Sequence, residues 1–118
     1  MENDHHTMKL TDIYDAILVL KGKDEIERFL TDLCTPQEME SLKERWHVCQ
    51  LLYNKDLSYR AISELTGVST TTVTRVSRFL HNEKNEGYKI ALERIKNVKK
   101  SNDNSCNAIK YSGMRKKT

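Results

Sequence analysis

Apolar residues along this chain recur at steps of three and four positions. No stretch alternates apolar with polar residues for long enough to predict a strand. Steps of three and four place side chains on one face of a helix. The first two apolar stripes cover residues 10–18 and 26–33, and Gly22 between them can take the left-handed conformation that ends a helix. The pattern therefore predicts an all-α fold.

The longest predicted helix has the clearest start signal. Thr35, Pro36 and Glu38 form a capping box, in which the threonine caps the helix and the glutamate reaches back to it. Apolar residues follow at helical steps, so the helix is predicted to run to about Asn54.

The length of 118 residues leaves room for one domain with a modest core. An apolar stripe over residues 88–98 predicts a last helix that begins near Glu86. Residues 99–118 are rich in Ser, Asn and Lys and contain few apolar residues, which is typical of disorder. We predict a single helical domain over residues 1–98 and a basic, disordered tail over residues 99–118.

Residues 58–81 have the pattern of a helix-turn-helix. Ser58 can cap a short helix that ends at residue 66, Gly67 can take the positive φ of a tight turn, and Ser69 can cap a second helix. The apolar residues predicted to face inward are Ile62, Leu65, Val68, Val73 and Val76. The polar residues then left outward on the second helix are Thr70, Thr71, Thr74, Arg75 and Arg78.

These outward side chains suit a nucleic acid. Hydroxyl and guanidinium groups in the first turns of a helix can bond phosphates and base edges in the major groove of DNA. A run of threonines does not favour helix formation, because threonine has a low helix propensity. The threonine-rich opening therefore favours a binding surface over an ordinary helical hairpin.

The charge distribution is consistent with this function. Residues 1–57 contain seven Lys and Arg against twelve Asp and Glu, whereas residues 58–118 contain thirteen against five. A positive half attracts phosphates. Because a basic tail can equally be a solvated end, charge alone leaves both interpretations open. The helix-turn-helix pattern decides for DNA.

Other function classes find little support. No run approaches the roughly 18 apolar residues of a membrane span, and the polar N-terminus is no secretory signal, so the cytoplasm is the predicted location.

The three cysteines, Cys34, Cys49 and Cys106, lack the spacing of a zinc site. The first two lie among apolar residues, where we expect them to be buried. The four histidines are scattered. We predict no catalytic residue, no metal site and no cofactor.

The stretch GVSTTTVTRV over residues 67–76 resembles the helix-turn-helix motifs of many bacterial repressors. With residues 33–80, which include the opening CTPQE, and YKIALERIK over residues 88–96, the chain resembles the tryptophan repressor family, and within it the uncharacterised, repressor-like branch. The resemblance covers about residues 10–98. It implies an intertwined dimer of six-helix subunits that reads a palindromic operator in successive major grooves. By position it implies DNA contacts from Arg60, Ser63, Thr70, Thr71, Thr72 and Thr74.

The tryptophan pocket of that family is only partly present. Arg45 and Arg75 stand at the positions of the two arginines that sandwich the indole. Val76 stands where the family has a glycine for close approach of the ligand, and Phe79 stands where a serine helps to hold the amino group. We therefore expect that tryptophan is not the corepressor, and the sequence identifies no other effector.

The leading hypothesis is a dimeric, sequence-specific transcriptional regulator that acts as a repressor. Two alternatives stay open: a DNA-architectural protein without a regulatory role, and a helical protein–protein adaptor. Sharp protection of one palindromic site would favour the regulator, and broad, salt-sensitive coverage of DNA would favour the architectural protein. Failure to bind any DNA at low salt would favour the adaptor.

Overall fold

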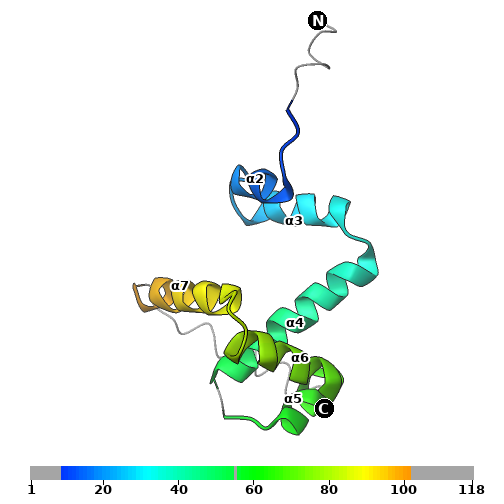
Figure 1. The fold of residues 1–118 in the computed structure, drawn as a ribbon, viewed down its shortest axis with the longest axis vertical. Helices are drawn as coiled ribbons and strands as arrows, with labels where there is room; N and C mark the ends of the chain where they lie inside the picture. Colours follow the sequence, from blue (N-terminus) through cyan, green and yellow to red (C-terminus); the bar gives the residue numbers. More distant parts are fainter. Residues whose placement is uncertain (1–8, 55, 102–118) are drawn as a thin grey trace, which may run out of the picture. The chain divides into compact units, whose positions relative to one another are not determined.

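The computed structural model describes residues 9–54 and 56–101, and every regular element there is a helix (Figure 1). The chain divides into two compact units, Met1–Met39 and Glu40–Thr118. The six helices of the described residues are α2 (Ile13–Leu18), α3 (Lys23–Leu33), α4 (Pro36–Asn54), α5 (Tyr59–Thr66), α6 (Thr70–His81) and α7 (Gly87–Ser101). The prediction of an all-α fold is confirmed.

In the first unit, α2 and α3 follow local sequence signals. The carboxylate of Asp12 caps α2 by accepting a hydrogen bond of 2.9 Å from the Asp15 N–H. Gly22 has a φ of +96° and directly precedes α3, whereas α2 ends at Leu18, earlier than the position of that glycine predicts. Neither helix contains a buried residue. Within a single chain, most residues of their apolar stripes are therefore exposed, and Phe29 and Leu30 are half-buried.

Helix α4 begins and ends as predicted. The Thr35 N–H donates to Glu38 Oε1 at 2.9 Å, and the Glu38 N–H donates to Thr35 Oγ1 at 3.1 Å. The capping box thus satisfies two backbone donors at the start of the helix, which would otherwise have no acceptor. The helix continues to Asn54.

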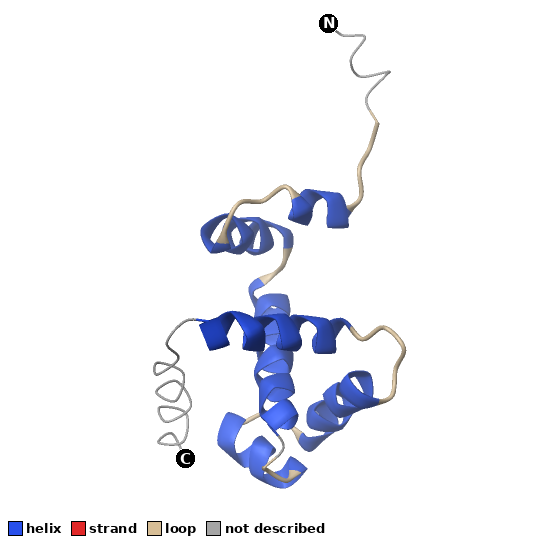
Figure 2. Cartoon of the chain, turned by 90° about the vertical axis from the view of Figure 1, so that its left-hand side faces the viewer, coloured by secondary structure: helices blue, strands red, loops and turns tan. Residues whose placement is uncertain are grey.

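The hydrophobic core lies in the second unit, whose helices Figure 2 shows from another side. Its buried members are Val48, Cys49, Leu51, Leu52, Ile62, Val68, Val73, Val76, Leu80 and Leu92. Four of the five residues predicted to face inward from the helix-turn-helix are among them, and the fifth, Leu65, is half-buried against the core. The predicted inward face is confirmed.

The two described cysteines differ from each other. Cys49 is fully buried as expected, and burial raises the pKa of its thiol to about 12, so the thiol is protonated at neutral pH. Cys34 is only half-buried, so the expectation of a buried side chain was wrong there. It follows the end of α3, in the unit that has no buried residue in its first two helices.

The turn between α5 and α6 depends on Gly67. This residue has a φ of +81°, and its N–H donates to the Ser63 carbonyl at 2.8 Å. The Ser63 hydroxyl donates to the Val68 carbonyl at 2.6 Å, and the Val68 N–H donates to Thr66 Oγ1 at 3.1 Å. These bonds fix the turn that sequence spacing predicts.

Replacing Gly67 by alanine should lower the free energy of unfolding by about 1–2 kcal/mol, because an L-residue is strained at this φ. A Cβ at residue 67 meets no atom within 4 Å, so the cost is conformational and not steric. Gly87→Ala is the matched control, since it opens α7 without a positive φ and also has space for a Cβ. Urea unfolding followed by circular dichroism measures both. Equal stability of the two variants would contradict the role of the left-handed turn.

Helix α7 begins one residue after the predicted start and continues to Ser101, three residues beyond the predicted end of the domain at residue 98. The rest of the predicted tail, residues 102–118, lies outside the described residues. Within residues 9–54 and 56–101, no helix is both long enough and apolar enough to cross a membrane.

Candidate nucleic-acid interface

Helices α5 and α6 form the predicted helix-turn-helix, with the predicted ends. Ser58 Oγ accepts a hydrogen bond of 3.0 Å from the Ala61 N–H, and Ser69 Oγ accepts one of 3.2 Å from the Thr72 N–H. Each serine is therefore the N-cap of its helix, as its position before a helical stripe predicts.

A side-chain bond that sequence reasoning missed joins the two helices. The hydroxyls of Tyr59, at the start of α5, and Ser77, in the second half of α6, are hydrogen-bonded to each other. Ser77 is buried among the apolar residues of α6, so its hydroxyl needs such a partner. A serine on the otherwise apolar inward face of α6 is the only sequence signal for this contact.

The hydroxyls predicted to touch DNA differ in how far the chain already uses them. Thr74 Oγ1 donates to the Thr70 carbonyl at 2.9 Å, and Thr72 Oγ1 accepts from Ser69 Oγ at 3.3 Å. Ser63 donates to the backbone of the turn. The side chains of Thr70 and Thr71 are exposed and make no hydrogen bond within the described chain. These two hydroxyls at the N-terminus of α6 are the most available to a ligand.

The three arginines of the helix-turn-helix all contact other side chains. Arg60 Nε lies 3.8 Å from an oxygen of Glu64, and Arg78 Nε lies 3.5 Å from an oxygen of Glu83. The Arg75 guanidinium carbon lies 4.7 Å from the centre of the Phe79 ring, a distance that allows a cation–π interaction. Residues 58–81 contain no lysine.

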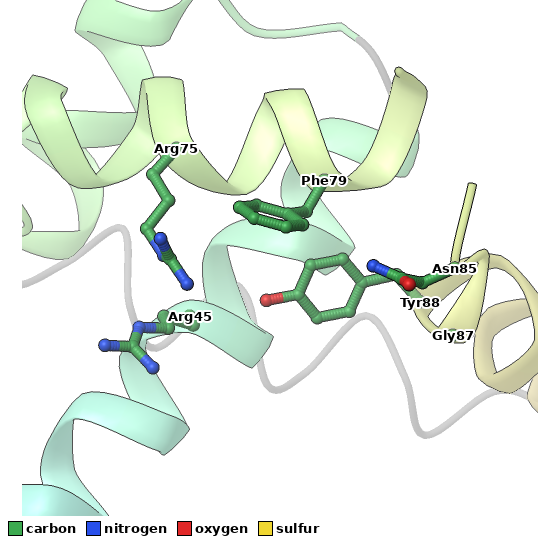
Figure 3. A pocket seen from close by; sticks show the side chains of 6 residues that line it. All are labelled: Arg45, Arg75, Phe79, Asn85, Gly87 and Tyr88. Carbon is green, nitrogen blue, oxygen red and sulfur yellow. The ribbon is translucent and has the colours of Figure 1, made fainter. Parts of the chain in front are cut away.

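Beside α6 lies a cavity of about 360 Å³ (Figure 3). Its lining residues are Arg45, Arg75, Phe79, Asn85, Gly87 and Tyr88. Figure 3 shows the side chains of Arg45 and Arg75 on the side toward which the Tyr88 hydroxyl points. The two arginines singled out in the sequence are thus brought together. The contributions of Asn85 and Tyr88 could not be seen in the sequence, because they depend on where the turn after α6 places the start of α7.

Two aromatic rings occupy this region. Burial raises the pKa of Tyr88, as does the nearby Cys49, while Arg45 and Arg75 act in the opposite direction. The Tyr88 ring also lies 6.4 Å from the ring of Trp46, centre to centre. Of the two residues that depart from the family pattern, Phe79 lines the cavity, whereas Val76 is buried in the core and does not line it.

A second cavity, of about 210 Å³, lies between α4 and the end of α5 and is lined mainly by polar residues. The part of the chain that the structure describes brings no three His, Cys, Asp or Glu side chains together around a possible metal ion. The polar groups that α5 and α6 expose include hydroxyl and guanidinium groups, carried on two capped, crossing helices. This arrangement defines a helix-turn-helix protein.

Comparison with known proteins is in accord with this class. The Trp repressor protein family matches residues 8–96. The uncharacterized protein YerC of Bacillus subtilis is 41% identical over 88 residues, which are 75% of this chain and 83% of that protein. The Trp operon repressor homolog of Vibrio cholerae is 34% identical over 83 residues, 70% of this chain and 80% of that protein. The homolog of Aliivibrio salmonicida is 46% identical over 54 residues, 46% of this chain and 50% of that protein.

The chain belongs to the Trp repressor family. This is a family of DNA-binding proteins without enzymatic activity, so the expectation that the chain is not an enzyme is confirmed. Family membership implies a DNA-binding regulator with a helix-turn-helix.

Proposed function

We propose that this protein is a sequence-specific transcriptional repressor of the cytoplasm that reads a palindromic operator with α6. The observation that carries the proposal is the pair of exposed, unbonded hydroxyls of Thr70 and Thr71 at the N-terminus of α6. A helix of this kind fits the major groove, and its first turns meet the base edges there. Family membership supports the same function.

The other contacts follow from position on the two helices. Arg60, on the exposed face of α5, and Arg78, near the end of α6, are proposed to bond phosphates. Arg75 is exposed on α6 and also lines the cavity, and it is proposed to contact DNA from that position. The full proposed set is Arg60, Ser63, Thr70, Thr71, Thr72, Thr74, Arg75 and Arg78.

The acting form is proposed to be a homodimer. Helices α2 and α3 contain no buried residue, and Tyr14 and Leu18 are 76% and 81% exposed. Removing apolar area of this kind from water is favourable by about 25 cal/mol per Å² when a partner covers it. A second copy also places two reading helices on the two halves of a palindrome.

We therefore expect a species of twice the 13.8 kDa chain mass in sedimentation at micromolar concentration. Replacing the exposed apolar Leu18 by lysine should weaken this association, whereas the exposed Lys96→Ala on α7 serves as a surface control. A stable monomer that still binds its operator tightly would contradict the dimer.

Tryptophan should not bind, and operator affinity should not depend on it. The Phe79 ring in the wall of the cavity already lies against the Arg75 guanidinium, so an indole could stack on Arg75 only by displacing that ring, and overpacking of this kind typically costs about 1–3 kcal/mol. Calorimetric titration with L-tryptophan, repeated with operator DNA, tests both statements. Phe79→Ser, which restores the hydroxyl of the family, is the matched variant and should bind tryptophan better than the parent. Micromolar binding to the parent that tightens DNA affinity would overturn this expectation.

The function itself is tested by selecting bound sequences from a random DNA pool, with and without amino acids. Recovery of one palindromic sequence and its sharp protection would support the repressor proposal. Salt-sensitive binding without sequence preference would contradict sequence-specific regulation and favour an architectural protein. Absence of binding at low salt would contradict DNA binding altogether.

A further inference from the structure

The helix-turn-helix carries little free positive charge. Its only Lys or Arg residues are Arg60, Arg75 and Arg78. Two of them are paired with carboxylates, Arg60 with Glu64 and Arg78 with Glu83, and the third lies on the Phe79 ring. Most of the positive charge of residues 58–118 lies after residue 81. Residues 58–81 thus hold three arginines against Glu64 alone, a net charge of +2, and Glu83 just beyond α6 lowers it to +1.

The pair of Arg78 and Glu83 joins α6 to the turn that follows it. Helix α6 ends at His81, so Glu83 approaches Arg78 from beyond the end of the helix. Arg78 also lies 5.0 Å from the centre of the Phe79 ring, which restricts its guanidinium further. Arg78 is four residues after Thr74, one turn further along the same outward row.

Arg60 and Glu64 form a second ion pair between an arginine and a carboxylate, on α5. The two residues are four positions apart, the Arg60 Nε and Glu64 Oε2 atoms are 3.8 Å apart, and both side chains are largely exposed. Exposed pairs of this kind contribute little to stability, because water screens them. A pair that contributes little to the stability of the fold can still change the affinity for DNA, which is highly charged.

A guanidinium that holds a carboxylate must release it before it can bond a phosphate. The pair as a whole is neutral, so it adds nothing to the release of counterions that supplies non-specific DNA affinity. Contacts from threonine hydroxyls to base edges do not depend on the release of counterions. An internal carboxylate thus weakens binding to every DNA sequence on which its arginine contacts a phosphate.

We propose that Glu64 and Glu83 are affinity-limiting residues, which compete with the phosphates of duplex DNA for Arg60 and Arg78. The inference rests on the proposed DNA-binding function and adds a role for acidic residues in and beside the reading helices. The partner is the phosphate backbone of duplex DNA of arbitrary sequence.

The test compares Glu83→Gln and Glu64→Gln with Glu93→Gln. Glu93 is an exposed residue of α7 with no ion pair within the described chain, so its variant makes the same change in net charge away from the helix-turn-helix. Fluorescence anisotropy is measured with a random-sequence duplex and with the selected operator, between about 50 and 200 mM salt. Melting temperatures show that each variant is folded.

For the random duplex at about 50 mM salt, Glu83→Gln and Glu64→Gln should each tighten binding by about 3–10-fold. The slope of log K against log salt should steepen by up to about 0.9 for each further phosphate that a released arginine neutralises. Operator affinity should rise by at least a similar factor, because Arg60 and Arg78 are proposed to bond phosphates there as well. Glu93→Gln should change all three quantities much less.

An equal effect of Glu93→Gln would overturn the proposal, because net charge alone would then explain the result. Unchanged or weaker random-duplex binding by both helix-turn-helix variants would overturn it as well. If the parent binds the operator and either of these results is found, only the role of Glu64 and Glu83 fails. If the parent binds no DNA at about 50 mM salt, the DNA-binding function fails and this proposal with it.

Discussion

Truncating Ile62 to alanine should lower the free energy of unfolding by about 2–5 kcal/mol. Ile62 has no exposed surface and is among the largest fully buried side chains of the core. It lies in the middle of α5, the shortest helix of the second unit, and it is the only fully buried residue that this helix contributes. The truncation removes apolar contacts and leaves a cavity, and the two costs add. Because a small domain is stable by only about 5–15 kcal/mol, the loss is a large part of the total.

Urea unfolding at fixed protein concentration measures this loss, and the m-value should stay unchanged if the native fold is retained. Leu57→Ala is the matched control, since it removes a similar volume from a side chain that is 39% exposed. The control should cost clearly less, because less apolar area leaves water there on folding. If the two variants lost the same stability, α5 would not be held to the core through Ile62.

The helix-turn-helix could be predicted to the residue because its signals are local. Ser58 and Ser69 cap the helices through bonds to N–H groups three residues away, and Gly67 sets the turn by its own backbone conformation. None of these signals depends on a distant part of the chain. The inward face could be predicted for the same reason, since helical spacing alone assigns Val73 and Val76 to one side of α6.

The contacts that sequence reasoning missed all join separate elements or depend on long side chains. The bond between Tyr59 and Ser77 requires the crossing angle of α5 and α6, and the place of Tyr88 in the cavity requires the path of the turn after α6. The pairing of Arg78 with Glu83 depends on which of many rotamers two long side chains adopt. The sequence showed that these residues are polar or aromatic, but not which partner each one takes.

The stripes of α2 and α3 illustrate a different limit. Their helical spacing was predicted, yet the same spacing says nothing about what covers them. In the described chain Ile13, Ile17 and Ile26 all remain more than a third exposed. An apolar periodicity identifies a face that can be buried, and it does not say which surface covers that face. This is why the dimer is a proposal while the helices are observed.

Replacing Thr71 by alanine should weaken binding to the selected operator by about 1–3 kcal/mol, or roughly 5–150-fold in Kd. Thr71 is exposed in the first turn of α6, and its hydroxyl makes no bond within the described chain. The hydroxyl can therefore bond a base edge without giving up a partner, and its removal leaves that edge unpaired in the interface. Thr74→Ala should cost less, because the Thr74 hydroxyl already donates to the Thr70 carbonyl.

A substitution at the neighbouring Val73 distinguishes an effect on folding from an effect on DNA recognition. Val73 is fully buried on the opposite side of α6, so Val73→Ala should lower stability by about 1–2 kcal/mol through a cavity and leave the affinity of the folded protein nearly unchanged. Thr71→Ala should show the reverse, with an unchanged melting temperature and a loss of affinity confined to the operator, since binding to random DNA depends on phosphate contacts. Titrating both variants against operator and random duplexes, with melting curves in parallel, distinguishes the two faces. A Thr71→Ala protein that melts at a lower temperature but keeps its operator affinity would show that α6 does not present this face to the bases.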